Sequence, residues 1–210
     1  MKIITAYQDF KDFRNSIESV SFVPTMGNLH NGHMALIDKA KSYDSHVVAS
    51  IFINPLQFND ASDFKNYPKS IDDDIAILSE HGCDSLFIPD SSILEDIKEI
   101  KAPDKALYLC GMNSPGHFDG VLTIVNKLFE IIKPSRSFFG KKDFQQLTLI
   151  SNFVKENNLV INKMGPHVQC VMNFNNNHIN DGGTLIVPCS HNYSKQWCIN
   201  NKNMKKMRPF

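Results

Sequence analysis

The chain has 210 residues, with 22 basic and 22 acidic side chains, so its formal net charge is zero. This balance gives no overall attraction to nucleic acid or to an anionic membrane surface, and we expect neither as a partner. The N-terminus does not resemble a signal peptide, and no apolar run approaches the ~20 residues that a membrane span requires, which predicts a cytoplasmic protein.

The first part of the sequence alternates short apolar runs with helical patterns. Residues 3–5 and 20–24 are expected to be strands, the second ended by Pro24, with a helix between them. Residues 32–43 follow as an amphipathic helix. Residues 47–53 are almost continuously apolar, which is typical of a strand buried on both faces of a parallel sheet.

The alternation continues to about residue 158. Further helices are expected at residues 72–81, 118–134 and 143–158, and further strands at residues 84–89 and 135–140. Repeated strand and helix units of this length predict an α/β fold with a doubly wound parallel sheet and right-handed crossovers.

Polar segments follow three of the expected strands. They are residues 24–33, residues 54–58 and residues 141–143. Ligands of open α/β sheets bind outside the carboxyl ends of strands, where helix N-termini offer unpaired N–H groups. If the three strands are parallel neighbours, the three segments meet at one edge of the sheet.

The first segment contains two histidines and two glycines. Gly27 permits a tight turn, and Gly32 lacks the Cβ that would keep a phosphate away from the backbone. His30 and His33 could both donate to the oxygens of one phosphate during a displacement. The alternative is that both histidines are ordinary surface or capping residues.

The third segment places two cations before a helix. Asp143 and Gln146 have the spacing of a capping box, which would explain both as helix-end residues. Capping leaves Gly140, Lys141 and Lys142 unexplained, because cations at a helix N-terminus oppose the macrodipole. An anionic ligand would resolve that conflict.

The second segment carries two uncharged amides. Asn54 and Gln57 could simply make turn and cap hydrogen bonds. Two amides at the carboxyl end of a strand also suit a ligand with hydroxyl and carboxylate groups, and the sequence leaves both interpretations open.

Five segments together resemble the pantothenate synthetase (pantoate–β-alanine ligase) family, in order and spacing, over about residues 1–162. The first also resembles the HxGH signature of the wider nucleotidyltransferase superfamily. The five segments are FVPTMGNLHNGH, SIFINPLQF, NYPKSIDDDIAIL, SPGHFDGVLTIVNKLF and FFGKKDFQQL.

The resemblance implies a Rossmann-like nucleotidyltransferase fold and a two-step reaction. ATP and pantoate would form pantoyl adenylate and pyrophosphate, with Mg²⁺ on the phosphates, and β-alanine would then displace AMP to give pantothenate. It also implies a homodimer. The alternatives are a catalytically impaired remnant that binds nucleotide or pantoate without turnover, and a different nucleotidyltransferase, which would leave the second and third segments without a reason to occur together.

The same resemblance implies the site residues, and the protein itself is expected to contribute no metal-ligand cluster. His33, His30 and Lys142 would act on the phosphates, while Gln57, Gln146, Asn54 and His117 would contact pantoate or β-alanine. The residues expected to line the ATP site are Pro24, Thr25, Met26, Gly27, His30, Gly32, His33, Gly140, Lys141, Lys142 and Asp143.

The sequence departs from the family at two places. Ser114 stands where the family has an arginine, so we expect weaker substrate binding. From residue 163 to residue 210 the chain is rich in asparagine and lacks the Ser-Ser-Arg-Asn loop of the family's smaller C-terminal domain. We therefore expect a Rossmann-like ATP- and pantoate-binding domain at residues 1–162, with that smaller domain largely missing.

The segment 163–210 has three interpretations: a divergent lid, a disordered extension, or the product of a reading-frame shift. The abrupt change in composition favours the last. A zinc site in this segment is disfavoured, because its cysteines and histidines lack paired close spacing. The five cysteines of the chain include no CxxC pair and are odd in number, which favours neither zinc nor a disulfide framework; they are Cys83, Cys110, Cys170, Cys189 and Cys198.

Overall fold

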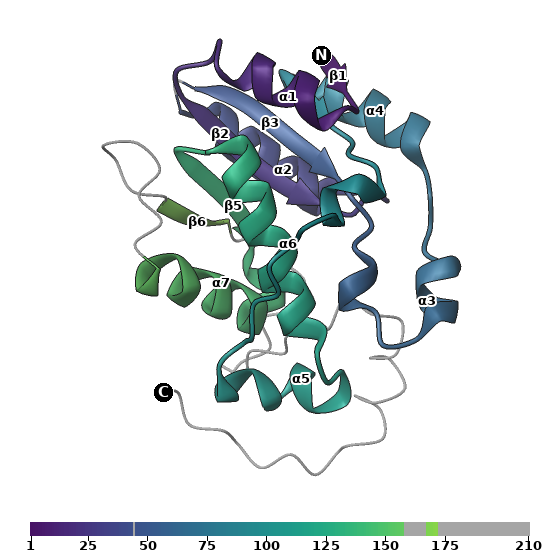
Figure 1. The fold of residues 1–210 in the computed structure, drawn as a ribbon. Coiled ribbons are helices and arrows are strands. Elements are labelled where there is room, and N and C mark those ends of the chain that lie inside the picture. The colour runs from purple at the N-terminus through teal and green to yellow at the C-terminus, as the bar shows by residue number, and fades with distance from the viewer. Residues whose placement is uncertain (44, 158–166, 172–210) are drawn as a thin grey trace, which may run out of the picture.

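The computed structural model describes residues 1–43, 45–157 and 167–171. Six parallel strands form one sheet in the order β1-β4-β3-β2-β5-β6 (Figure 1). The α/β class and the parallel sheet predicted from the sequence are confirmed. The strands are β1 (Lys2–Ile4), β2 (Val20–Thr25), β3 (His46–Ile51), β4 (Ser85–Phe87), β5 (Arg136–Gly140) and β6 (His167–Val171).

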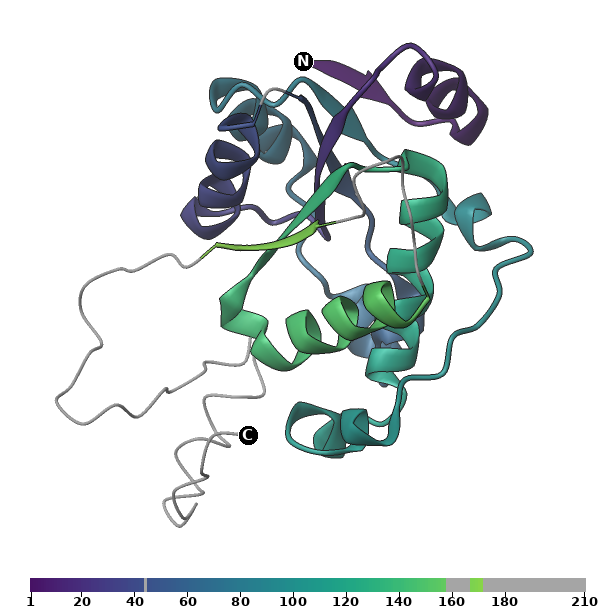
Figure 2. The ribbon, with the colours of Figure 1, turned by 90° about the vertical axis from the view of Figure 1, so that its left-hand side faces the viewer.

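Helices cover both faces of this sheet, as Figure 2 shows with the sheet between them. α2 and α4 pack on one face around Ile37 and Leu78, and α1, α6 and α7 pack on the other around Phe10, Leu122 and Ile150. The α-helices are α1 (Tyr7–Arg14), α2 (Asn31–Lys41), α3 (Ala61–Lys65), α4 (Ile71–Glu80), α5 (Cys110–Asn113), α6 (His117–Ile132) and α7 (Phe144–Glu156). Short 3₁₀ turns lie between them at η1 (Pro55–Gln57), η2 (Ser91–Leu94), η3 (Asp104–Leu107) and η4 (Lys141–Asp143).

The strand order reverses between β2 and β5. The chain adds β3 and β4 successively on one side of β2 and then returns to place β5 on the other side. In doubly wound sheets this point of reversal leaves a crevice at the carboxyl ends of the two strands. The fold therefore places the segments after β2 and β5 beside each other.

One strand runs further than the sequence predicted. β2 continues through Pro24 to Thr25, whereas Pro24 was expected to end it. The alternation of backbone groups turns Pro24 toward β5, and pairing between β2 and β5 already stops at Phe22 opposite Ser137. The missing N–H of the proline therefore costs no ladder hydrogen bond.

β6 lies beyond the domain boundary expected at residue 162. It pairs in parallel with β5, from Arg136 opposite His167 to Gly140 opposite Val171. The division at residue 162 stays a prediction, and the expectations for residues 172–210 fall outside the described part of the chain. Within the described part, no helix is long and apolar enough to cross a membrane.

Candidate functional site

The three polar segments meet at one edge of the sheet, as the sequence predicted. β3, β2 and β5 are parallel neighbours, so the residues after each strand share the carboxyl edge. The segment after β2 leads into α2, and the segment after β5 leads into η4 and α7. Two helix starts therefore face the point where the strand order reverses.

His30 and His33 form the start of α2 through a reciprocal cap. His30 is the N-cap residue, and its Nδ1 accepts from the N–H of Gly32 at 3.0 Å. The Nδ1 of His33 accepts from the N–H of His30 at 3.3 Å. Both rings therefore use Nδ1 as an acceptor, which in the neutral imidazole leaves the proton on Nε2 as a donor.

The surroundings keep both imidazoles neutral. Burial, followed by the nearby His30 and Lys142, lowers the pKa of His33 to about 4. Burial and then Lys142 also lower the pKa of His30, against the opposing effects of Asp143 and a backbone hydrogen bond. Near pH 7 the pair therefore offers two Nε2–H donors with ring centres 4.2 Å apart.

Lys142 and Asp143 reach the histidine pair across the point of strand reversal. Their charges act on His30, and the charge of Lys142 also acts on His33. The side chain of Asp143 makes no capping hydrogen bond at the start of α7. The capping-box explanation of this segment is therefore wrong, and two lysines remain at a helix start, where an anion would stabilise them.

Gly32 makes room for a neighbouring ring, while the approach of a phosphate to its backbone stays a prediction. A Cβ on Gly32 would lie 2.7 Å from His30 Cε1 and 3.0 Å from His30 Nδ1. The glycine therefore leaves room for the capping ring of His30 itself. Gly27 has a φ of +82°, which confirms the tight turn expected after β2.

Asn54 is committed to internal hydrogen bonds. Its side chain is 1% exposed, accepts from the N–H of Leu56 at 3.1 Å, and donates to the carbonyl oxygen of Gly120 at 3.0 Å. It also donates to Gln57 Oε1 at 3.3 Å. The structure thus shows the turn and cap hydrogen bonds expected for Asn54, while contact with a ligand stays a prediction.

Gln57 lies between α6 and the segment after β2. Its Nε2 contacts the sulfur of Met26 at 2.6 Å, and its carbonyl oxygen is 2.8 Å from Nδ1 of the buried His117. Gly120 lets α6 approach this turn, because a Cβ there would lie 2.2 Å from the carbonyl oxygen of Leu56. Three of the residues expected to contact pantoate or β-alanine, Asn54, Gln57 and His117, are therefore neighbours around the start of α6.

The two adjacent glutamines of α7 differ. Gln146, expected to contact pantoate, is half-buried in the first turn. Gln145 instead holds the segment before α6, because its Oε1 accepts from Cys110 N–H at 3.0 Å and its Nε2 donates to the Tyr108 carbonyl oxygen at 2.7 Å. Ser114, in the family's arginine position, is the half-buried C-cap residue of α5.

Sequence reasoning missed Asp74. This carboxylate is 3% exposed and accepts from the N–H of Asn28 at 2.9 Å and of Leu29 at 2.7 Å. The three aspartates at residues 72–74 all look like favourable charges in the first turn of a helix. This shared explanation hides the separate role of Asp74 as a buried acceptor. Asp74 does share the buried side of α4 with Leu78, four residues later, and that spacing was the available signal.

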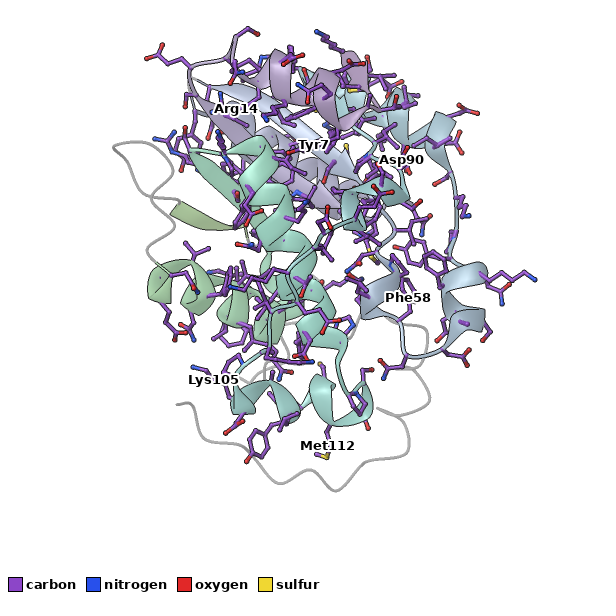
Figure 3. All side chains as sticks on the ribbon, in the orientation of Figure 1. Tyr7, Arg14, Phe58, Asp90, Lys105 and Met112 are labelled. Carbon is purple, nitrogen blue, oxygen red and sulfur yellow. The ribbon has the colours of Figure 1, made fainter. Side chains whose placement is uncertain are left out.

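A cavity of about 400 Å³ lies at the carboxyl ends of β2, β3 and β4, and no pattern in the sequence predicted it. Figure 3 labels Asp90, which lines it. The lining residues are mostly apolar and include Met26, Gly27, Ile51, Ile53, Phe64, Ile71, Asp74, Ile88, Asp90 and Leu94. Met26, Gly27 and Asp74 connect this cavity to the segment between β2 and α2.

Known proteins are similar to this chain over most of its described residues. A family model described as pantoate-beta-alanine ligase matches residues 2–169. The pantothenate synthetase of Acinetobacter baylyi is 39% identical over 184 residues, covering 83% of this chain and 66% of that protein. A bifunctional pantoate ligase/cytidylate kinase of Prochlorococcus marinus is 48% identical over 160 residues, 72% of this chain but 31% of that protein.

Solved structures agree with these relatives. A pantoate-beta-alanine ligase from Francisella tularensis, complexed with beta-gamma ATP and beta-alanine, gives a TM-score of 0.77 at 40% identity and covers 82% of this chain and 67% of that one. Pantothenate synthetase from Thermus thermophilus gives 0.72 at 36% identity, with coverages of 82% and 62%. The chain therefore spans between about a third and two thirds of the length of these relatives, and it belongs to the pantoate-beta-alanine ligase family.

Proposed function

We propose that this chain catalyses the ATP-dependent condensation of pantoate with β-alanine to pantothenate, through pantoyl adenylate, with release of pyrophosphate and AMP. The observation that carries the proposal is the pair of neutral imidazoles beside Lys142 where the strand order reverses. The F. tularensis relative, complexed with beta-gamma ATP and beta-alanine, supports the choice of substrates.

The nucleotide half of the reaction would use charge and orientation. The Nε2–H groups of His30 and His33 donate to phosphate oxygens as negative charge rises during displacement, and Lys142 supplies a full positive charge. The start of α2 adds the positive end of its macrodipole. The remaining residues expected to line the ATP site flank these groups after β2 and β5.

The acyl half would use the amides next to η1. Gln57 and Gln146 hold the hydroxyl and carboxylate of pantoate, while Asn54 and His117 set the position of Gln57 through the contacts described above. Holding two reactants in line in this way lowers the entropy cost of each displacement. Ser114 adds no charge here, so we expect pantoate to bind more weakly than in relatives with arginine.

Mg²⁺ would accompany ATP. In the described residues, no group of three or more histidines, cysteines or acids could hold a metal ion. Mg²⁺ commonly binds through substrate phosphates, waters and one or two carboxylates, so this donor set fits an ion that arrives with the nucleotide. The ion would neutralise phosphate charge, and Asp143 is the carboxylate placed beside His30.

The test is AMP formation by the purified chain, dependent on both pantoate and β-alanine. We expect His33→Ala to lower this rate by about two to three orders of magnitude, as expected for loss of one electrostatic donor. His81→Ala serves as a control and should keep the rate, because His81 is a partly exposed residue at the C-terminal end of α4, away from the histidine pair. ATP binding without AMP release would instead identify a remnant that binds without turnover.

We also propose a cytoplasmic homodimer. Several large apolar side chains near α5 and the start of α7 are exposed, and Figure 3 shows Met112 at the far end of α5. Such a patch marks an association surface. These residues are Leu107, Tyr108, Leu109, Met112 and Phe144. Light scattering during gel filtration should give twice the 23.8 kDa chain mass, and Met112→Glu should lower it.

The division into residues 1–162 and 163–210 remains part of the proposal. Its support is the change in composition at that point and a family model that ends at residue 169. Limited proteolysis should first cut after residue 162, and early cuts within residues 1–157 would contradict it.

A further inference from the structure

The turn between β2 and α2 is fixed by a series of hydrogen bonds in which backbone N–H groups donate to side chains. Four successive N–H groups, at residues 27–30, each bind a side-chain atom. Thr25 takes the first at 3.2 Å and His33 takes the last. Asp74 takes the two in the middle and is the one acceptor of the four bonds that comes from outside residues 25–33.

This turn needs an external partner because of its backbone. Gly27 has a φ of +82°, and Asn28 follows with a φ of +52°, in the left-handed region that side chains with a Cβ disfavour. The carboxylate of Asp74 binds this turn with one oxygen accepting from the N–H of Asn28 and the other from the N–H of Leu29. A Cβ on Gly27 would lie 3.0 Å from Asp74 Oδ2, so the turn is packed directly against the carboxylate.

We propose that Asp74 is a positioning residue, which holds residues 27–29 so that His30 and His33 face the nucleotide phosphates. The inference rests on the proposed function of the histidine pair. Asp74 is 3% exposed on α4, and its two oxygens bind the backbone of the turn, so it acts on the rings through residues 28 and 29. Small displacements of aligned catalytic groups lower rates by large factors. The hydrogen bonds from the turn to Asp74 should therefore affect turnover.

The first experiment measures the turn itself by NMR. In Asp74→Asn the amide can accept from one N–H but presents an NH₂ group to the other. We expect hydrogen exchange at Asn28 and Leu29 to become at least tenfold faster, and His30 and His33 to lose their preference for the Nε2–H tautomer. Asp72→Asn, an exposed carboxylate in the same helical turn, should leave both measurements unchanged.

The second experiment separates positioning from stability. Asp74→Asn should lower kcat for pantoate-dependent pyrophosphate release at least tenfold, with less than a threefold change in KM for ATP. Leu78→Ala, a buried apolar truncation in the same helix, should lower the unfolding midpoint and keep kcat at temperatures well below that midpoint.

The outcomes are distinct. Unchanged exchange and tautomers in Asp74→Asn would overturn the inference, and so would altered exchange with an unchanged kcat. If the wild-type chain binds ATP but releases no AMP or pyrophosphate, the proposed function fails. The NMR arm, repeated with the nonhydrolysable β,γ-imido analogue of ATP, then decides the role of Asp74: the inference predicts that the analogue shifts the His30 and His33 ring signals in the wild type and not in Asp74→Asn.

Discussion

The proposed nucleotide side, around His30 and His33, and the proposed acyl side, around Asn54 and Gln57, differ in how they use their polar atoms. On the nucleotide side, His30 and His33 spend only Nδ1 on the protein and keep Nε2–H for a ligand. On the acyl side, Asn54 is 1% exposed and bonds to Gly120, Leu56 and Gln57. The difference teaches that one half of the proposed site leaves ring donors available for a ligand, while part of the other half uses its polar atoms in internal hydrogen bonds.

The largest expected effect is on the nucleotide side, from Lys142→Ala. Loss of the cation should lower the rate of AMP formation by about 10²- to 10³-fold, because it removes charge stabilisation in the transition state. Lys142 is exposed, so the free energy of unfolding should stay within about 0.5 kcal/mol. Steady-state kinetics and urea unfolding check both statements, with Lys127→Ala on α6 as the control.

Asn54→Ala should affect stability more than Lys142→Ala does. Removing the side chain leaves the buried carbonyl of Gly120 and the N–H of Leu56 without their partners, which costs about 1–3 kcal/mol of unfolding free energy. Urea unfolding measures this loss. A variant as stable as the wild type would contradict the assignment of Asn54 as a residue that holds the acyl side together.

The pH dependence of stability should reveal the lowered pKa of His33. Its pKa is about 4 in the folded chain and near 6.5 when unfolded, so the unfolded state binds the proton first as the pH falls. Stability from this group is complete above pH 6.5, declines between pH 6.5 and pH 4, and is flat below. Because His33 is half-buried, we expect about 1–2 kcal/mol, which His33→Gln should abolish in unfolding measured at pH 4.5 and pH 7.

The smallest effect is expected for Asp143→Ala. Its side chain is half-exposed and does not cap α7, and interactions of such exposed charges contribute little, so the free energy of unfolding should change by less than about 0.5 kcal/mol. A loss of 1 kcal/mol or more in urea unfolding would restore the capping-box explanation.

Much of the fold was predictable because its strands and helices are strongly patterned. The continuous apolar run at residues 47–53 and the amphipathic pattern at residues 32–43 correspond to β3 and α2. The prediction failed where tertiary contacts decide where a strand ends. Pro24 continues a strand because its missing N–H faces a gap in the ladder, and periodicity does not show where pairing stops.

The candidate site was predicted in its position and only in part in its interactions. That the polar segments converge follows from parallel strands, which the sequence could indicate. The reciprocal cap of His30 and His33 depends on ring orientation, and the grip of Asp74 joins residues 46 positions apart. The sequence does not show such contacts, and for Asp74 it offered only the four-residue spacing to Leu78 on the buried side of α4.

The most direct test of the central claim is titration of the ¹⁵N-labelled chain with Mg²⁺-ATP, followed by NMR. The account predicts the largest shifts at the backbone N–H of Gly32, at the ring Nε2 signals of His30 and His33, and at Lys142. Unchanged signals at these positions, with shifts confined to the cavity around Ile88 and Leu94, would contradict it.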